Sequence, residues 1–207
     1  DLEINNDNIF GSGNRLKFQQ LFDTKRNPKY SYGIEFLSRN IAGSFLNVAA
    51  GINFERPAFN SAKREENSYF LRGELPLVGP YHPYTGGFDL SVNNTQNAYS
   101  SDSLYNQQLK YGYYNADIWL GYSLGAKEQM LDNLGTRKRN ILSARVLHRY
   151  FNLRPDTLQT IYDSRYNDVT GLLFSYTVFE RDFYHTNFIY GFGRNEDLPE
   201  GFSLSFT

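Results

Sequence analysis

Residues 45–55, with the sequence FLNVAAGINFE, decide the fold class of this chain. Leu46, Val48, Ala50, Ile52 and Phe54 are apolar, and the residues between them are small or polar. Only an extended strand places such a series on one face, because successive side chains of a strand point to opposite sides. The segment therefore predicts a β-strand with one apolar and one polar face.

The same alternation recurs along the chain, with polar connections between its copies. Residues 109–124 are long enough for two strands around a tight turn near residues 115–117. Residues 1–14, 56–67 and 193–201 are interpreted as turns or loops, and residues 126–134 as a loop with no more than one helical turn. Apart from the regular succession of strands and turns, we find no internal repeat. We expect roughly ten or eleven antiparallel strands, at residues 16–22, 30–36, 45–55, 69–75, 88–93, 109–124, 140–152, 169–180, 188–192 and 202–206.

Composition limits the class of protein. The 207 residues suffice for one large β domain that spans residues 1–207. Cysteine is absent, which excludes a disulfide framework and cysteine metal sites, and the net charge of −1 gives no basis for binding nucleic acid. No stretch approaches the roughly 20 apolar residues of a transmembrane helix, so a helical membrane protein is excluded. Because residues 1–8 are acidic and polar, unlike a signal peptide, we expect a processed chain or an internal piece of a longer one.

Two environments fit the alternation. In a soluble sandwich or barrel the apolar rows face a shared core, and in a membrane barrel they face lipid while the polar rows line the lumen. The polar rows here are rich in Gly, Ser and Asn with isolated charges, which suits a crowded lumen better than a solvated surface. The apolar rows carry aromatic residues near their ends, as in the aromatic girdles of membrane barrels: Tyr30, Phe36, Phe54, Tyr69, Tyr122 and Phe174. We therefore favour an antiparallel transmembrane β-barrel.

Several motifs resemble the Omp85 superfamily of outer-membrane barrels, of the surface-antigen type related to the BAM and TAM insertases, in a form typical of Bacteroidetes. The resemblance covers most of the chain. Its motifs are GSGNRL at residues 11–16, SRNIAGS at 38–44, DIWLGY at 117–122 and YGFGRNEDLPEG at 190–201.

The resemblance implies a barrel of about sixteen strands, preceded by periplasmic POTRA domains, in the outer membrane of a Gram-negative cell. The hallmark Arg-Gly motif beside an aromatic residue is missing, since Arg72-Gly73 lies too early and lacks the aromatic residue. We therefore expect an incomplete barrel that stops before this motif, without the POTRA domains and the last strands. The implied function is assembly of outer-membrane proteins or polypeptide translocation. The implied partners are the bilayer with its lipopolysaccharide, client outer-membrane proteins, and periplasmic or lipoprotein subunits.

Two alternatives stay open. A barrel of ten strands could close by itself and act as a pore or structural protein, because an even strand number permits closure. A soluble antiparallel β domain could bind a ligand through its tyrosine-rich loops, because aromatic-rich strands also occur in soluble proteins.

The sequence offers no site for covalent chemistry. His82, His148 and His185 are far apart and lack partners at ligand spacing, so we predict no metal site. The pair Glu196-Asp197 beside Arg194 reads as a turn rather than an acid/base site. No nucleophile elbow or phosphate loop is found. We predict that the protein is not an enzyme and has no catalytic residue, cofactor or metal.

The remaining polar motifs are given structural interpretations. The basic run at residues 137–139 is a solvated loop or a contact for lipopolysaccharide phosphates, and the sequon at residues 93–95 is a chance match. Tyr81, His82 and Tyr84 belong to a packed turn, with carbohydrate binding as the alternative. The charges of Glu35, Glu74 and Arg145 are expected to pair across the lumen and to stiffen it.

Overall fold

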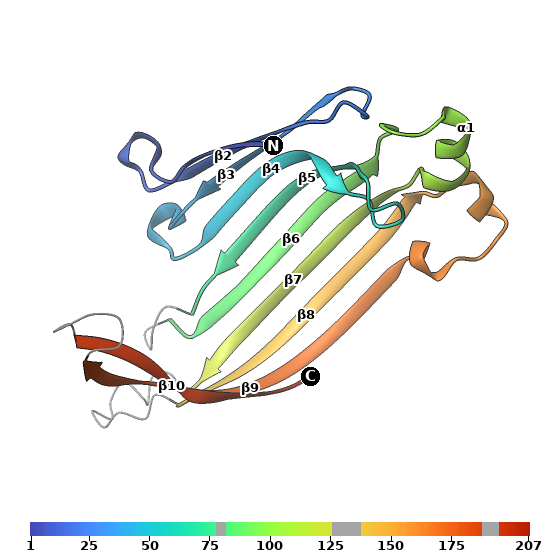
Figure 1. Cartoon of the computed structure of the whole chain (residues 1–207). Helices are drawn as coiled ribbons and strands as arrows, with labels where there is room; N and C mark the ends of the chain where they lie inside the picture. The colour runs from blue at the N-terminus through green and yellow to red at the C-terminus, as the bar shows by residue number, and fades with distance from the viewer. Residues whose placement is uncertain (78–81, 126–137, 188–194) are drawn as a thin grey trace. The chain divides into compact units, whose positions relative to one another are not determined.

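The structure is a computed structural model, and it describes residues 1–77, 82–125, 138–187 and 195–207. Its ten strands form one antiparallel sheet in which each strand neighbours the next in the chain (Figure 1). This confirms an all-β fold with about the predicted number of strands. In the described residues the sheet is open, with β1 and β10 at its edges. The strands are β1 Leu2–Asn6, β2 Arg15–Phe22, β3 Tyr30–Ser38, β4 Asn47–Pro57, β5 Arg64–Leu75, β6 Tyr84–Thr95, β7 Gly112–Leu124, β8 Lys138–Leu153, β9 Val169–Asn187 and β10 Asn195–Phe206.

The chain divides into two compact units, which are described separately. Unit 1 comprises Asp1–Pro76, Gly87–Ile118 and Val146–Leu172, and unit 2 comprises Leu77–Gly86, Trp119–Arg145 and Leu173–Thr207. In unit 2, the rings of Tyr84 and Tyr122 lie 5.2 Å apart, and the hydroxyls of Thr177 and Ser205 are 2.8 Å apart across the β9–β10 pair.

In the part of the chain that the structure describes, helical turns lie in the connections between strands. They are Ile9–Gly11, Ile41–Gly43, α1 at Asp102–Leu104, Tyr105–Leu109, Asp156–Gln159 and Ser164–Tyr166. Within the described ranges, no helix has both the length and the apolar character needed to cross a membrane.

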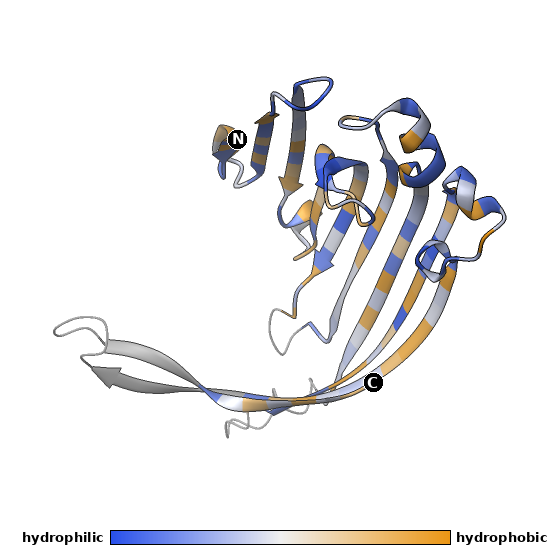
Figure 2. Cartoon of the chain, turned by 45° about the vertical axis from the view of Figure 1, so that its right-hand side comes forward, coloured by the Kyte–Doolittle hydropathy of each residue, from blue (hydrophilic) through white to orange (hydrophobic). Residues whose placement is uncertain are grey.

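The register of unit 1 sorts its side chains into cross-strand rows. Ile34 of β3 stands opposite Phe18 of β2 and Ile52 of β4, and Ile52 stands opposite Tyr69 of β5. The next row on the same face joins Leu16, Phe36, Ala50 and Leu71. Gln19, Gly33, Asn53 and Ser68 form a row on the opposite face. Bands of hydrophobic and hydrophilic colour alternate along these strands (Figure 2). We call the two sides the apolar face and the polar face.

A β-bulge near the end of β4 changes which side chains reach the polar face. Asn53 stands opposite Ser68, and the next pair along the ladder is Arg56 with Glu66. Two residues of β4 therefore oppose one residue of β5 between these pairs, which is the arrangement of a β-bulge. Without the bulge, Arg56 would share the parity of Ile52 and point to the apolar face. The bulge brings Arg56 to the polar face, beside Glu66.

Three sequence-based boundaries were wrong. Only residues 112–124 of the segment 109–124 are extended, and they form a single strand, β7, instead of two strands around a turn. Residues 2–6, expected in a turn-like segment, pair with β2 as the edge strand β1. The loop expected at residues 56–67 is shorter and spans residues 58–63, since β4 runs to Pro57 and β5 begins at Arg64. Pairing to neighbouring strands supplies hydrogen bonds that local turn propensity cannot reveal.

The interpretation of residues 193–201 as a turn was also wrong where the chain is described. Residues from Asn195 onward belong to β10, and Glu196 and Asp197 pair with Thr186 and His185 of β9. The helical turn expected at residues 126–134 lies outside the described residues, as does most of the strand expected at 188–192.

Two successive hairpins end in nearly the same turn, a repeat that the sequence reading missed. Residues 8–12 read NIFGS and residues 40–44 read NIAGS. In both turns the serine hydroxyl donates to the isoleucine carbonyl at 2.6 Å. Phe10 and Ala42, at the middle position, both have φ in the left-handed region, at 52° and 54°. Arg39 links the turns, because its backbone N–H donates to the Asn14 side chain and its guanidinium to the Gly13 carbonyl.

Candidate functional site

The apolar face of unit 1 is the more exposed face of the sheet. In β3, Tyr30, Tyr32, Ile34 and Phe36 are all exposed, whereas Ser31 between them is only 4% exposed. Leu16, Tyr69, Leu71, Leu90 and Val92 extend the exposed apolar surface over neighbouring strands. A water-soluble sheet normally buries its apolar rows and exposes its polar rows, so the two faces of this sheet have the reverse arrangement.

Aromatic rings gather at one end of the apolar face. Phe54 lies edge-on to Tyr32 and Tyr69, with ring centroids 5.0 and 5.8 Å away, and Tyr114 stacks on Tyr150 at 6.5 Å. Phe22 and Tyr30 form a further pair, 5.0 Å apart. These seven residues are called the aromatic row. Six of them lie near the ends of β2, β4 and β8 or the beginnings of β3 and β7, and Tyr69 lies within β5. Tyrosine combines an apolar ring with a polar hydroxyl, which suits the boundary between hydrocarbon and headgroups.

The polar face of unit 1 holds ion pairs between adjacent strands. Arg15 contacts Glu35 at 2.7 Å, Lys17 contacts Glu3 at 3.0 Å, and Arg72 contacts Asp89 at 2.9 Å. The positive and negative groups are interspersed, so no large surface of one sign forms. Glu35 was expected to pair across a lumen, but its partner, Arg15, lies on the neighbouring strand β2. Glu74 stands opposite Asn47, and Arg145 lies in β8 of unit 2.

Two polar cavities open on this face and share Gln19, Asn53 and Arg56 in their lining. One, of about 270 Å³, also includes Asp1 and Arg64, and the other, of about 240 Å³, includes Glu35 and Arg72. Their guanidinium groups face carboxylates, as in the Arg64–Asp1 contact of 3.2 Å. The cavities thus offer hydrogen bonds to a polar chain rather than a site for one charged ligand.

Four loops interlock at the end of unit 1 near the aromatic row. They are residues 23–29, 58–63, 96–111 and 154–168, and together we call them the loop cap. The backbone N–H of Asn27 donates to the Ala98 carbonyl at 2.8 Å, which joins the first loop to the third. Thr157 donates its hydroxyl to the Gln107 carbonyl at 2.6 Å, which joins the fourth to the third. The loops at residues 96–111 and 154–168 lie beside one another in Figure 1.

Glu65, at the start of β5, anchors the third loop. Its side chain is 1% exposed and accepts hydrogen bonds from the backbone N–H groups of Ala98 and Tyr99, at 3.3 and 3.2 Å. The Ser61 hydroxyl is a third donor, at 3.2 Å. A buried carboxylate is stable only when hydrogen bonds replace its hydration. The loop supplies these bonds, and the carboxylate in turn fixes the loop.

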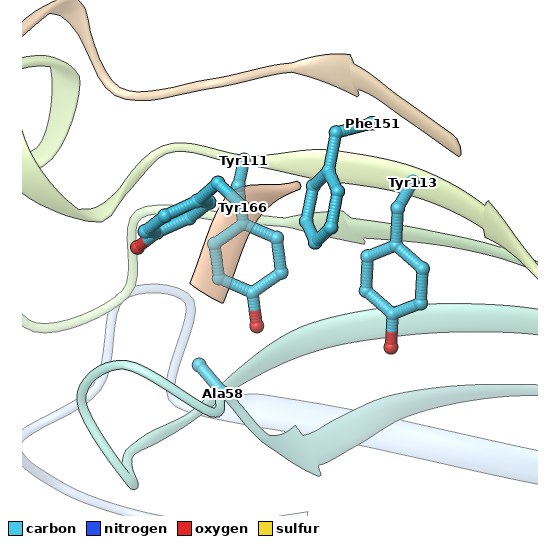
Figure 3. Close-up of a cluster of buried hydrophobic side chains, with 5 residues drawn as sticks. All are labelled: Ala58, Tyr111, Tyr113, Phe151 and Tyr166. Atoms are coloured by element: carbon cyan, nitrogen blue, oxygen red, sulfur yellow. The ribbon is translucent and has the colours of Figure 1, made fainter. Parts of the chain in front are cut away.

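A small aromatic core lies beneath the loop cap. It consists of Ala58, Tyr111, Tyr113, Phe151 and Tyr166, which come from different loops and strands (Figure 3). The hydroxyls of Tyr111 and Tyr113 point to the same side in that view. Tyr111 donates to Glu66 at 2.6 Å, and Tyr113 donates to the other oxygen of the same carboxylate at 3.3 Å. The polar ends of the core are therefore satisfied by a buried acid.

Electrostatics around Glu66 favours a neutral tyrosine beside it. Burial and the bond to the Glu66 carboxylate raise the pKa of Tyr111 well above its usual value near 10. The Arg56 guanidinium stands 3.7 Å from Glu66 and donates to Ser68 and to the buried Asn93. The bulge that turns Arg56 to this face thus supplies a partly exposed cation to the buried Glu66, Ser68 and Asn93, and the role of this network is structural.

The histidines are not brought together. His148 lies in β8, where its Nδ1 is 2.8 Å from the Thr170 hydroxyl, and His185 lies in β9 opposite Asp197. His82 precedes β6, and Tyr84 begins that strand. Within the described ranges, no group of three or more possible metal ligands clusters. Tyr81, Arg137 and Arg194 lie outside the described residues, whereas Lys138 and Arg139 begin β8.

The sequence interpretation missed Glu65, Glu66 and Asn93 as interior residues. Glu65 and Glu66 fell in an expected loop. Asn93 was placed in the polar row of the strand expected at residues 88–93 and in a chance sequon, without a role in the interior. All three are buried, although they occur beside strongly alternating strands. The available signal was the alternation itself, because Glu66 has the parity of Ser68 on the polar face, and Asn93 that of Asp89. No such signal marks Glu65.

Comparisons with protein-family models, curated proteins and solved structures found no match. The resemblance to the Omp85 superfamily accordingly stays a prediction.

Proposed function

We propose that this chain is a membrane-embedded sheet of an outer-membrane β-barrel of the Omp85 type, which assembles outer-membrane proteins or translocates polypeptide. The reversed polarity of the two faces carries the proposal. Exposed Ile34 and Phe36 of β3 suit hydrocarbon. On the other face of the same strand, buried Ser31 and ion-paired Glu35 suit a lumen. The aromatic row supports a headgroup boundary on the same face.

The strand lengths agree with this placement. A membrane strand needs roughly 9–11 residues. β4 has 11 residues and β5 has 12, so each can cross the hydrocarbon when tilted. Ile34 lies at the middle of β3, where a charge on the lipid side is most costly.

The proposed mechanism uses the edges of the sheet. Each edge strand has one hydrogen-bonded neighbour among the described strands, β2 for β1 and β9 for β10. The outer side of an edge strand presents backbone N–H and C=O groups that can pair with an incoming strand. In hydrocarbon such pairing is strongly favoured, because unpaired backbone groups are costly there. No covalent step is required.

Placing arginine on the apolar face should prevent stable insertion. Ile34→Arg is expected to cost about 2–4 kcal/mol in the bilayer, whereas Gln19→Arg, on the polar face beside Glu3, should be tolerated. Flotation with liposomes and urea unfolding in bilayers measure the difference. Equal insertion of both variants, or a wild-type chain that stays monomeric in plain buffer, would contradict the membrane placement.

Client capture should occur at an edge strand. The chain has no cysteine, so single cysteines report specific positions. During folding of a cysteine-bearing outer-membrane barrel into liposomes that contain this protein, Ile4→Cys in β1 or Ser203→Cys in β10 should form mixed disulfides with the client. Ile34→Cys, exposed in an interior strand, is the control. Equal capture at all three positions would argue against templating by an edge.

A further inference from the structure

The exposed apolar face of unit 1 contains a groove. It has a volume of about 720 Å³, lies over β3 to β7, and is almost entirely apolar. Its side chains include Phe36, Ala50, Ile52, Leu71, Leu90 and Val92. The volume falls within the range of roughly 300–1,000 Å³ for small-molecule sites.

The residues of the sheet explain the depression. Ala50 stands directly between Phe36 and Leu71 in the cross-strand row. Its methyl group is much shorter than the side chains of either neighbour. The surface is therefore lower over β4 than over β3 and β5, whose longer side chains project further from the sheet. The hollow is thus set by a small residue at one register position.

One end of the groove reaches the aromatic row. Tyr69 and Tyr114 line the groove and belong to that row. Both side chains are exposed, and within the described part of the chain neither hydroxyl is hydrogen-bonded. Two polar donors therefore stand at the head of an otherwise apolar channel.

We propose that the groove holds the acyl chain of a phospholipid whose headgroup lies against Tyr69 and Tyr114. This inference rests on the proposed membrane placement. An acyl chain has no polar groups to satisfy, which matches the apolar lining, and its headgroup matches the tyrosine hydroxyls.

A polypeptide occupant fits the groove less well. The groove lies over β4, whose backbone is already paired with β3 on one side and β5 on the other. A peptide strand therefore finds no free edge to extend there. The lining between Phe36 and Val92 also offers an incoming peptide backbone few hydrogen-bond partners.

Photocrosslinking in bilayers tests the site. The full chain is reconstituted in nanodiscs with phosphatidylethanolamine that carries a diazirine in its acyl chain, irradiated, and mapped by peptide mass spectrometry. Labelling at Ala50, Leu71 and Leu90 is expected to exceed that at Val146 and Leu172 by about fivefold or more. Val146 and Leu172 are the control because they belong to unit 1 and are at least as exposed as Leu71 and Leu90.

A filled groove provides the matched comparison. Ala50→Leu should remove the enrichment at Leu71 and Leu90, whereas Ala49→Leu, which adds the same atoms on the polar face, should retain it. Uniform labelling of the apolar face in the wild type would overturn the groove while leaving the membrane placement intact. Labelling of none of these residues would contradict the membrane placement itself. The wild-type map decides the question even where a variant does not fold.

Discussion

Replacing Glu65 by alanine is expected to free the loop at residues 96–111 and to lower the free energy of unfolding by about 3–5 kcal/mol. The substitution leaves the N–H groups of Ala98 and Tyr99 and the Ser61 hydroxyl without their acceptor in a buried site. Each buried donor that loses its partner costs about 1–3 kcal/mol, and partial relaxation of the loop reduces the sum.

Two measurements check this result. Urea unfolding followed by circular dichroism gives the change in free energy. Trypsin cleavage after Lys110, the one basic residue of this loop, reports its release. Glu65→Gln is the matched control, since it keeps an acceptor oxygen and should lose less than half as much stability. Because the backbone carbonyl of residue 65 still accepts from Gln96 N–H in both variants, the difference isolates the side chain. Unchanged cleavage in Glu65→Ala would refute the anchoring role.

Gly51→Ala is expected to destabilise the sheet by about 1–3 kcal/mol, although alanine is usually the better residue inside a strand. A Cβ at this position would collide with the Ile34 carbonyl oxygen of the neighbouring strand and stand 2.7 Å from Cζ of Phe70. The backbone of β3 cannot yield without loss of its pairing with β4. Gly51→Val adds further atoms and should prevent the native pairing.

Gly33 provides the control for this substitution. It lies on the same polar face, but an added Cβ would meet its nearest neighbour, the Ile52 carbonyl oxygen, at 3.5 Å, an ordinary contact. Gly33→Ala should therefore be neutral or stabilising by up to about 1 kcal/mol. Urea midpoints of the two alanine variants, compared with wild type, measure the contrast. Equal midpoints would contradict the prediction, because they would show that β3 and β4 can move apart at Gly51 to accept the added Cβ without loss of stability.

The strand pattern could be predicted where the alternation is long. Leu46 to Phe54 predicted β4 correctly, because burial on one face and exposure on the other require a period of two. The pattern failed at Asp117 and its neighbours, where turn-forming residues lie inside β7. Pairing with β6 and β8 outweighs their local preference there.

The candidate site depended on features that a sequence does not display. The bulge that turns Arg56 to the polar face depends on the register with β5, not on residue type. The burial of Glu65 depends on donors from Ala98 and Tyr99, which are distant in the chain. The alternation predicted which face is apolar. It did not predict the groove over Ala50, which arises from the sizes of side chains on three different strands.

The simple strand order has an evolutionary consequence. Every strand pairs with its neighbours in the chain, so no connection crosses another. A hairpin can therefore be duplicated or deleted without rerouting the rest of the polypeptide. The matching turns NIFGS and NIAGS, at the tips of consecutive hairpins, are what a tandem duplication of such a unit would leave behind. Sheet width in this lineage would then change by whole hairpins, two strands at a time.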